Sequence, residues 1–339
     1  MSLITGIFSA LIAGMLNGSF AAPLKKIKYW EWENTWIIYA FTGLLLLPFF
    51  ATIITVPELW DVYAHVEVSV ILKTLITGML YGIGSITFGL GLHLAGLSLG
   101  YSLMIGIIAI TGSLVPMLII SPESIFTVGG LIISLAMVVC LSGIIYCAKA
   151  GALREQSADK TSNEDGSRFR LALIVCIVSG LFSSMLNISL VMGQPIADLA
   201  KLHIGGSLVN FRATNAVWLI TLSGAFVPYV FYCFFLFFRN KSINNYTKSS
   251  FNFYRAGFMG VLWFLGILVY GAGVSSFGKF GTTIGWLILM AFTVITGNLW
   301  GFFTGEWHNA PSEAKMKMYK GLGLLLISVV IVSIGKFYL

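Results

Sequence analysis

Residues 78–91 read GMLYGIGSITFGLG, and residues 260–273 read GVLWFLGILVYGAG. The two stretches carry glycine at four matching positions, and they pair Tyr81 with Trp263 and Phe88 with Tyr270. Both lie in apolar segments of about 20 residues, which is the length needed to cross a bilayer as a helix. The pair therefore predicts membrane-spanning helices in a chain that repeats its own pattern.

The composition agrees with a membrane protein. The chain has 339 residues, of which 58% are hydrophobic and 10% charged, and its mean hydropathy is +0.92. A soluble domain carries about 25% charged residues, so water cannot be the solvent for most of this surface. The net charge of +7 does not indicate nucleic-acid binding, because the basic residues lie in short loops between apolar stretches.

The hydropathy pattern predicts an all-α integral membrane protein with ten transmembrane helices. The predicted spans are 3–22, 36–56, 71–92, 97–119, 125–147, 171–193, 213–238, 256–276, 282–303 and 320–337. The first span lacks a basic segment before it, so we interpret it as a retained helix and not a cleaved signal peptide. We divide the chain into a five-helix repeat at 1–148, a polar cytoplasmic linker at 149–169 and a second five-helix repeat at 170–339.

The basic residues predict the orientation. Fifteen of the twenty Lys and Arg residues fall in the loops after the first, fifth, seventh and ninth spans. Since Lys and Arg concentrate in cytoplasmic loops, we expect these loops inside the cell and both termini outside.

Two further pairs of helices repeat. The segment 15–19 (MLNGS) resembles 185–189 (MLNIS), which matches Asn17 with Asn187. The segment 96–115 aligns without gaps onto 281–300 and places Tyr101 opposite Trp286. Because each half has five helices, an odd number, the second half enters the membrane in the opposite direction, and such a repeat is inverted, as in many secondary transporters. The glycines taken singly are explained equally well by close helix packing.

Polar and aromatic residues inside the predicted spans suggest a site for a small neutral polar solute such as a sugar. Amides bind hydroxyl groups, and aromatic faces cover the apolar side of a sugar ring. The candidate substrate-binding residues are Asn17, Tyr81, Tyr101, Asn187, Gln194, Trp263, Trp286 and Asn298. The alternative for each is a structural hydrogen bond between helices or an anchor at the membrane interface.

Three acids near span ends are candidate proton-coupling residues: Glu306, Asp198 and Glu33. Glu306 ranks first because it ends the span with the best repeat match, although a bond to Lys25 or Lys26 would make it structural. The four histidines are scattered and show no metal-binding spacing. No cofactor motif or catalytic cluster is recognisable, so we expect no cofactor, no metal and no enzyme activity.

Three segments carry a family resemblance: 23–33 (PLKKIKYWEWE) with Trp36, 82–90 (GIGSITFGL), and 306–310 (EWHNA). They resemble the bacterial L-rhamnose–proton symporter family of the drug/metabolite transporter superfamily. The resemblance implies a ten-helix inverted repeat in the cell inner membrane that imports a deoxy sugar with a proton. His93 and Gln194 depart from the basic residues that enterobacterial members carry there, which leaves the sugar open.

Several alternatives remain at this stage. Sodium could replace the proton as coupling ion, and the protein could be a monomer or a homodimer. Another small metabolite could be the cargo, in either direction. A membrane-embedded transferase would require an acid or His/Asp cluster in a loop, and none is evident.

Overall fold

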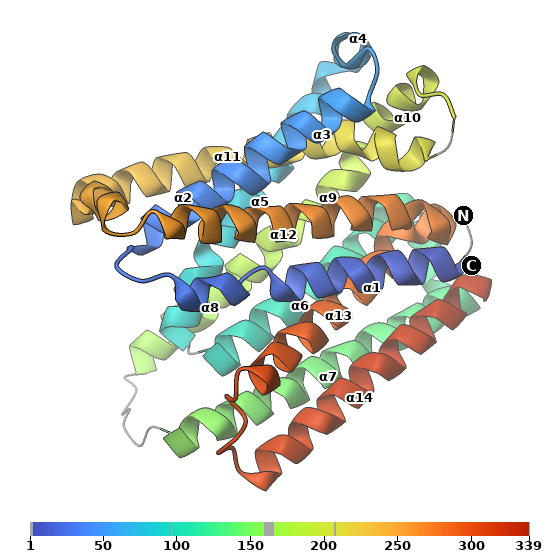
Figure 1. The fold of residues 1–339 in the computed structure, drawn as a ribbon. Coiled ribbons are helices and arrows are strands. Elements are labelled where there is room, and N and C mark those ends of the chain that lie inside the picture. Colours follow the sequence, from blue (N-terminus) through green and yellow to red (C-terminus); the bar gives the residue numbers. More distant parts are fainter. Residues whose placement is uncertain (1–2, 96, 159–165, 207, 339) are drawn as a thin grey trace.

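The computed structural model describes residues 3–95, 97–158, 166–206 and 208–338, and this part of the chain contains helices but no strand. Eight long continuous helices of the described residues form much of the bundle (Figure 1). They are α1 (Leu3–Ser19), α5 (Val68–Ala95), α6 (Leu97–Ile120), α7 (Val128–Ala158), α11 (Val209–Asn240), α12 (Phe251–Val274), α13 (Gly281–Phe303) and α14 (Ser312–Gly335).

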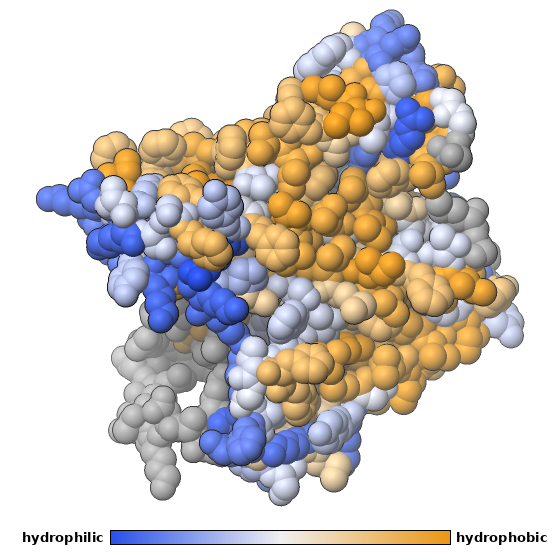
Figure 2. Space-filling view, viewed as in Figure 1, coloured by the Kyte–Doolittle hydropathy of each residue, from blue (hydrophilic) through white to orange (hydrophobic). Residues whose placement is uncertain are grey.

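Nine stretches of the described residues are long and apolar enough to span a membrane. One of them, Phe251–Phe303, contains two helices, α12 and α13, which a 3-10 turn at Ser275–Phe280 separates. Gly278 in this turn has φ 73°, a left-handed conformation that glycine adopts without strain. Figure 2 shows an apolar surface between hydrophilic regions at the left, where Figure 1 shows the connection between α1 and α2, and at the upper right around α4 (Leu59–His65).

Two predicted spans are not single α-helices. The span at 36–56 consists of α2 (Trp32–Ala40), a π-helical turn (Phe41–Leu46) and α3 (Leu47–Thr55). Pro48 lacks an N–H group and cannot bond to the preceding turn, which favours such an irregular ladder. The span at 171–193 consists of α8 (Gly166–Ser183) and α9 (Met185–Met192), and α10 (Gln194–His203) follows.

The polar linker predicted at 149–169 is shorter than its composition suggested. Helix α7 continues to Ala158, and α8 begins at Gly166, while residues 159–165 lie outside the described part of the chain. The segment after Lys149 contains Ala, Leu, Arg, Glu and Gln, which are good helix formers despite their polarity. Polarity therefore did not show where the helix ends.

Close packing of helices uses the repeated glycines. Helix α1 packs between α12 and α13, α5 packs against α8 and α11, and α7 pairs with α14. A Cβ atom on Gly78 would collide with the carbonyl group of Thr221 on α11. The backbones thus approach to a distance that only glycine allows at this position.

Candidate functional site

A cavity of about 1470 Å³ lies among α1, α2, α5, α6, α7, α12 and α13, and the adjoining ends of α8 and α9 also contribute to its lining. On α1 and the turn after it, the lining begins at Ile12 and extends to Lys26; on α13 and the segment after it, the lining extends from Trp286 to Trp307. Lys25, Lys26, Arg154 and Glu306 belong to the lining as well. The cavity therefore reaches from the middle of the bundle to the end that carries the basic loops.

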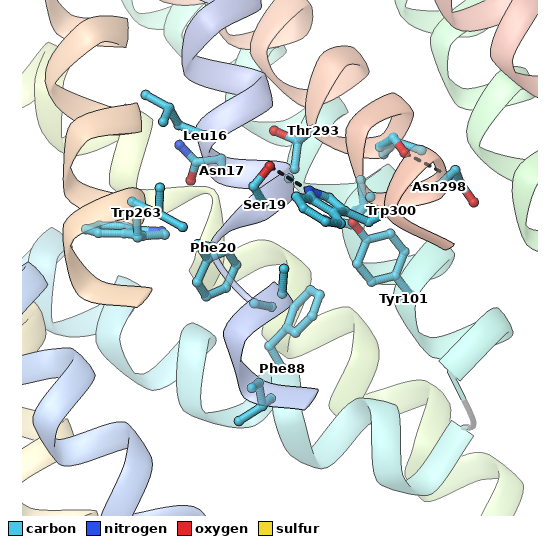
Figure 3. A pocket seen from close by; sticks show the side chains of 18 of the residues that line it. Leu16, Asn17, Ser19, Phe20, Phe88, Tyr101, Trp263, Thr293, Asn298 and Trp300 are labelled. Carbon is cyan, nitrogen blue, oxygen red and sulfur yellow. Dashed lines mark hydrogen bonds between the residues drawn. The ribbon is translucent and has the colours of Figure 1, made fainter. Parts of the chain in front are cut away.

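Aromatic rings form much of the cavity wall. The rings of Tyr81 and Trp263 are stacked with their centroids 6.0 Å apart, and Tyr39 meets Trp263 edge-on at 6.2 Å. Figure 3 shows Trp263, Phe20, Phe88 and Tyr101 arranged around one space. Rings from α5, α6 and α12 thus offer flat apolar faces to a solute.

Two amides supply hydrogen-bonding groups to the same cavity. Asn17 Nδ2 donates to the Ala13 carbonyl at 3.2 Å, and Asn298 Nδ2 donates to the Val294 carbonyl at 2.9 Å. Among the described residues, no group donates to the Oδ1 atom of either amide. Each Oδ1 is thus available to accept a hydrogen bond from a hydroxyl group of a solute.

Six of the eight predicted substrate-binding residues line this cavity. They are Asn17, Tyr81, Tyr101, Trp263, Trp286 and Asn298. Gln194 lies outside it, is exposed, and donates to Asp198 Oδ1 at 2.9 Å. Asn187 also lies outside it and is fully buried.

The hydrogen bonds of Asn187 explain its position. Its Nδ2 donates to the carbonyl groups of Gly112 (2.7 Å) and Thr282 (2.9 Å), and its Oδ1 accepts from the Tyr270 hydroxyl (2.6 Å). Near this site, Trp286 Nε1 donates to the Ile108 carbonyl at 3.0 Å. These bonds join α6, α9, α12 and α13, and we name the group Asn187, Tyr270, Gly112 and Thr282 the deep-end cluster. Asn187 therefore has no free group for a solute.

Glu306 is held by two cations. Its carboxylate pairs with Lys25 and, at 2.8 Å, with Arg154 Nη1. Partial burial raises the pKa of Glu306, but the hydrogen bond and charge of Lys25 together with Arg154 outweigh it and lower the pKa below its ordinary value. A bond to Lys25 or Lys26 would make Glu306 structural, and the bond to Lys25 is present.

Asp198 is held in a similar way at the opposite end of the bundle. Lys201 Nζ lies 2.8 Å from its Oδ1, and Gln194 donates to the same atom. Partial burial raises the pKa of Asp198, but the bonds to Lys201 and Gln194 and the lysine charge prevail and lower it. Both acids therefore stay ionised at neutral pH.

Glu33 is held differently. Its side chain is 1% exposed, and its Oε1 accepts hydrogen bonds from Asn240 Nδ2 at 3.0 Å and from the Ser242 hydroxyl. Its partners lie about 200 residues away in the sequence, on the end of α11 and on the 3-10 segment Ser242–Lys248. No local pattern could have shown that this acid is buried.

Sequence reasoning missed part of the cavity wall. Trp32, Trp36 and Tyr39 on α2 line it, and so does Ser85 on α5, one of the polar residues that the sequence places at membrane depth. Ser85 Oγ lies 2.7 Å from the Tyr229 hydroxyl, and the Trp32 and Tyr229 rings are parallel. The signal that could have found the α2 residues was the dense run of aromatics at 29–39 in the family-like segment.

One group of the described residues has side-chain atoms close enough to share a metal ion: Glu58, Asp61 and His203. Both acids are exposed, and His203 Nδ1 lies 2.9 Å from Glu58 Oε2. We interpret this group as surface ion pairs between α4 and α10.

Comparison with known proteins places the chain beside transporters. The family model described as "L-rhamnose-proton symport protein (RhaT)" matches residues 1–337. Proteins named L-rhamnose-proton symporter from Klebsiella pneumoniae (strain 342), Enterobacter sp. (strain 638) and Escherichia coli (strain 55989 / EAEC) are each 26% identical to it over 341 residues. Each alignment covers 97% of this chain and 97% of the relative.

Proposed function

The chain belongs to the L-rhamnose-proton symport family, and we propose on this premise that it imports L-rhamnose or a related deoxy sugar together with a proton. The observation that carries the proposal is the cavity, which is deep enough for a sugar and combines stacked aromatic rings with two free amide oxygens. The six predicted residues that line it form the proposed sugar site. Gln194 lies outside the cavity, so its departure from the family pattern does not alter the wall.

We further propose ten membrane spans arranged as two inverted five-helix repeats. Equivalent contacts in the two halves support this arrangement. A Cβ atom on Gly78 would collide with the carbonyl of Thr221, and a Cβ atom on Gly260 would lie 2.8 Å from the carbonyl of Tyr39. Gly260 follows Gly78 in the sequence by the same number of residues as Thr221 follows Tyr39. The contact of α5 with α11 thus reappears as the contact of α12 with α2.

The first helices of the two halves, α1 and α8, also make equivalent contacts. A Cβ atom on Gly84 would collide with the backbone of Ser183, and one on Gly266 would collide with the side chain of Asn17. These contacts pair Asn17 with Ser183, one helical turn from Asn187, which the sequence had matched with Asn17. Ser183 also lines the cavity, and its buried hydroxyl has no hydrogen-bond partner among the described residues.

A third contact supports the pairing of Asn17 with Ser183. A Cβ atom on Gly180 would meet Ile107 at 2.7 Å and the carbonyl of Met104 at 3.2 Å, and one on Gly14 would meet Phe292 and the carbonyl of Leu289. The gapless alignment of 96–115 with 281–300 pairs Met104 with Leu289, so Gly180 and Gly14 make equivalent contacts. Gly180 precedes Ser183 by the same number of residues as Gly14 precedes Asn17.

The last helices of the two halves pair with each other. A Cβ atom on Gly143 of α7 would lie 3.0 Å from the carbonyl of Gly321 on α14, and one on Gly321 would lie 2.8 Å from the carbonyl of Gly143. Such a reciprocal contact is expected where a two-fold axis passes between two helices. The cavity between the halves is then the place where secondary transporters of this kind bind their cargo.

Uptake into proteoliposomes tests the proposed function. With labelled L-rhamnose and an acidic exterior, we expect accumulation above the outside concentration, which a protonophore abolishes. A sodium gradient alone should not replace the pH gradient. If another sugar or a non-sugar metabolite competes better than L-rhamnose, the cargo assignment is wrong; if no gradient drives uptake, symport is wrong.

A further inference from the structure

The three candidate acids of the proposed symport differ in the side chains that bond to their carboxylates. This difference bears on which acid could carry the proton. Glu306 and Asp198 pair with lysine or arginine, which favours their ionised forms. A symporter needs instead an acid that takes a proton on one side of the membrane and loses it on the other. A cation held beside the acid opposes the first of these steps.

Glu33 has no such cation. Among the described residues, no basic nitrogen lies within ion-pair distance of its carboxylate, and only neutral donors, Asn240 and Ser242, bond to its Oε1. Its Oε2 accepts no hydrogen bond from the described residues. A buried carboxylate without a cation is costly, and binding a proton at Oε2 removes that cost.

The groups that surround Glu33 are neutral or acidic. Cys233 of α11 and Tyr246 of the segment Ser242–Lys248 are titratable groups close to Glu33. Glu31 lines a small cavity beside Glu33. Arg239 and Lys241, the neighbours of Asn240, are exposed, and among the described residues neither forms an ion pair with Glu33. Among the described residues, no side-chain cation therefore neutralises Glu33.

Glu33 also adjoins the sugar cavity. A side cavity of about 230 Å³ is lined by Glu33 and Asn240, and it shares Trp32 and Gly89 with the lining of the large cavity. Asn240 is exposed at the basic end of the bundle, and its side chain bonds to Glu33. The Asn240 side chain thus links the acid to the solvent.

The helix that carries Glu33 also carries part of the sugar site. Trp32, Trp36 and Tyr39 of α2 line the large cavity, and the π-helical turn Phe41–Leu46 joins α2 to α3. π-Helical turns occur frequently at functional sites. We propose that Glu33 carries the coupling proton, and that its hydrogen bonds to Asn240 and Ser242 transmit protonation to the cavity by repositioning α2.

The other half of the chain supports this assignment. The residue separation that relates Tyr39 to Thr221 places Asn215 at the position equivalent to Glu33. Asn215 is 1% exposed, as Glu33 is, so the equivalent site in the second half holds a neutral amide. An amide at this position is thus compatible with the fold, and the acid is particular to the first half.

The test uses the full-length protein in proteoliposomes. We expect Glu33→Gln to lose accumulation driven by a pH gradient but to retain exchange of labelled for unlabelled sugar, with no dependence on pH. Glu313→Gln, which changes an exposed acid paired with Lys317, is the matched control and should retain both activities. Glu306→Gln should remain coupled to the proton, whatever its rate. Coupled accumulation by Glu33→Gln would overturn the assignment.

A second variant covers the case in which Glu33→Gln does not fold. Ser242→Ala removes one of the two donors that bond to Glu33 Oε1, so uptake should extend to higher pH if Glu33 carries the proton. We expect the pH of half-maximal uptake to rise by about half a unit to one unit. An unchanged pH profile would also overturn the assignment. Failure of the wild-type protein to couple sugar uptake to a pH gradient would instead contradict the proposed function.

Discussion

Asn17 and Asn187 show how the same residue type in the same sequence pattern acquires two different roles. Both are amides within apolar segments, which made both candidates for binding. Asn187 uses both its hydrogen-bonding atoms within the protein, whereas Asn17 leaves Oδ1 free at the cavity wall. Gly266 makes room for the Asn17 side chain, since a Cβ there would collide with Nδ2. The sequence could identify the residue type but not the partners of each amide.

The free oxygen of Asn17 leads to a prediction at the residue scale. If Oδ1 accepts a hydrogen bond from a sugar hydroxyl, Asn17→Ala should raise KM for the sugar about two- to tenfold, the effect of losing one neutral hydrogen bond. Initial uptake rates over a range of sugar concentrations measure this change. Asn244→Ala, an exposed amide on the surface, serves as control and should leave KM unaltered. An unaltered KM in Asn17→Ala would remove Asn17 from the sugar site.

At the scale of elements, hydropathy was sufficient to locate the spans but not their interruptions. Apolar residues fill a π-helical turn or a broken helix as readily as a regular helix, so the average over 20 residues does not reveal the breaks at Phe41–Leu46 and Ser184. The continuation of α7 to Ala158 was missed for the opposite reason, because polar residues are compatible with a helix outside the membrane. The similarity of the spans 71–92 and 256–276, on which the proposed repeat depends, could be recognised because several of their glycines lie at close contacts between helices.

The deep-end cluster leads to a prediction for the elements it joins. Alternating access requires these helices to separate, so Asn187→Ala should favour opening at this end. A cysteine at Thr283, which is fully buried on α13, reports the opening in a background without the four native cysteines. We expect Asn187→Ala to increase the labelling rate of Thr283→Cys several-fold with an impermeant maleimide.

The control for this prediction is an amide at the other end of the bundle. Asn252 is fully buried, and its Nδ2 donates to the Lys28 carbonyl at 2.8 Å. Asn252→Ala therefore removes a comparable bond without touching the deep-end cluster. Equal labelling of Thr283→Cys in the two variants would mean that the cluster does not keep this end closed.

At the scale of the whole molecule, the charge distribution was readable from the sequence because it depends on loops and not on packing. The basic turn after α1, with Lys25 and Lys26, lies at one end of the bundle, and α4 with Glu58 and Asp61 lies at the other (Figures 1 and 2). The cavity, in contrast, is lined by residues of nine described helices and could not be outlined before these were packed. Because the cavity reaches the basic end, the orientation predicted from the charges also predicts which side of the membrane the cavity faces.

The final prediction is the orientation of the bundle. If the basic end is cytoplasmic, the cavity in this structure faces the cytoplasm, and Glu33 is placed to release its proton there. Single cysteines at Trp60 on α4 and Asn244 at the basic end are exposed reporters in a background without native cysteines. We expect an impermeant thiol reagent to label Trp60→Cys on intact cells and Asn244→Cys only after permeabilisation. The reverse result would mean that the cavity faces outward, so the proton site would be open to the side from which a symporter loads.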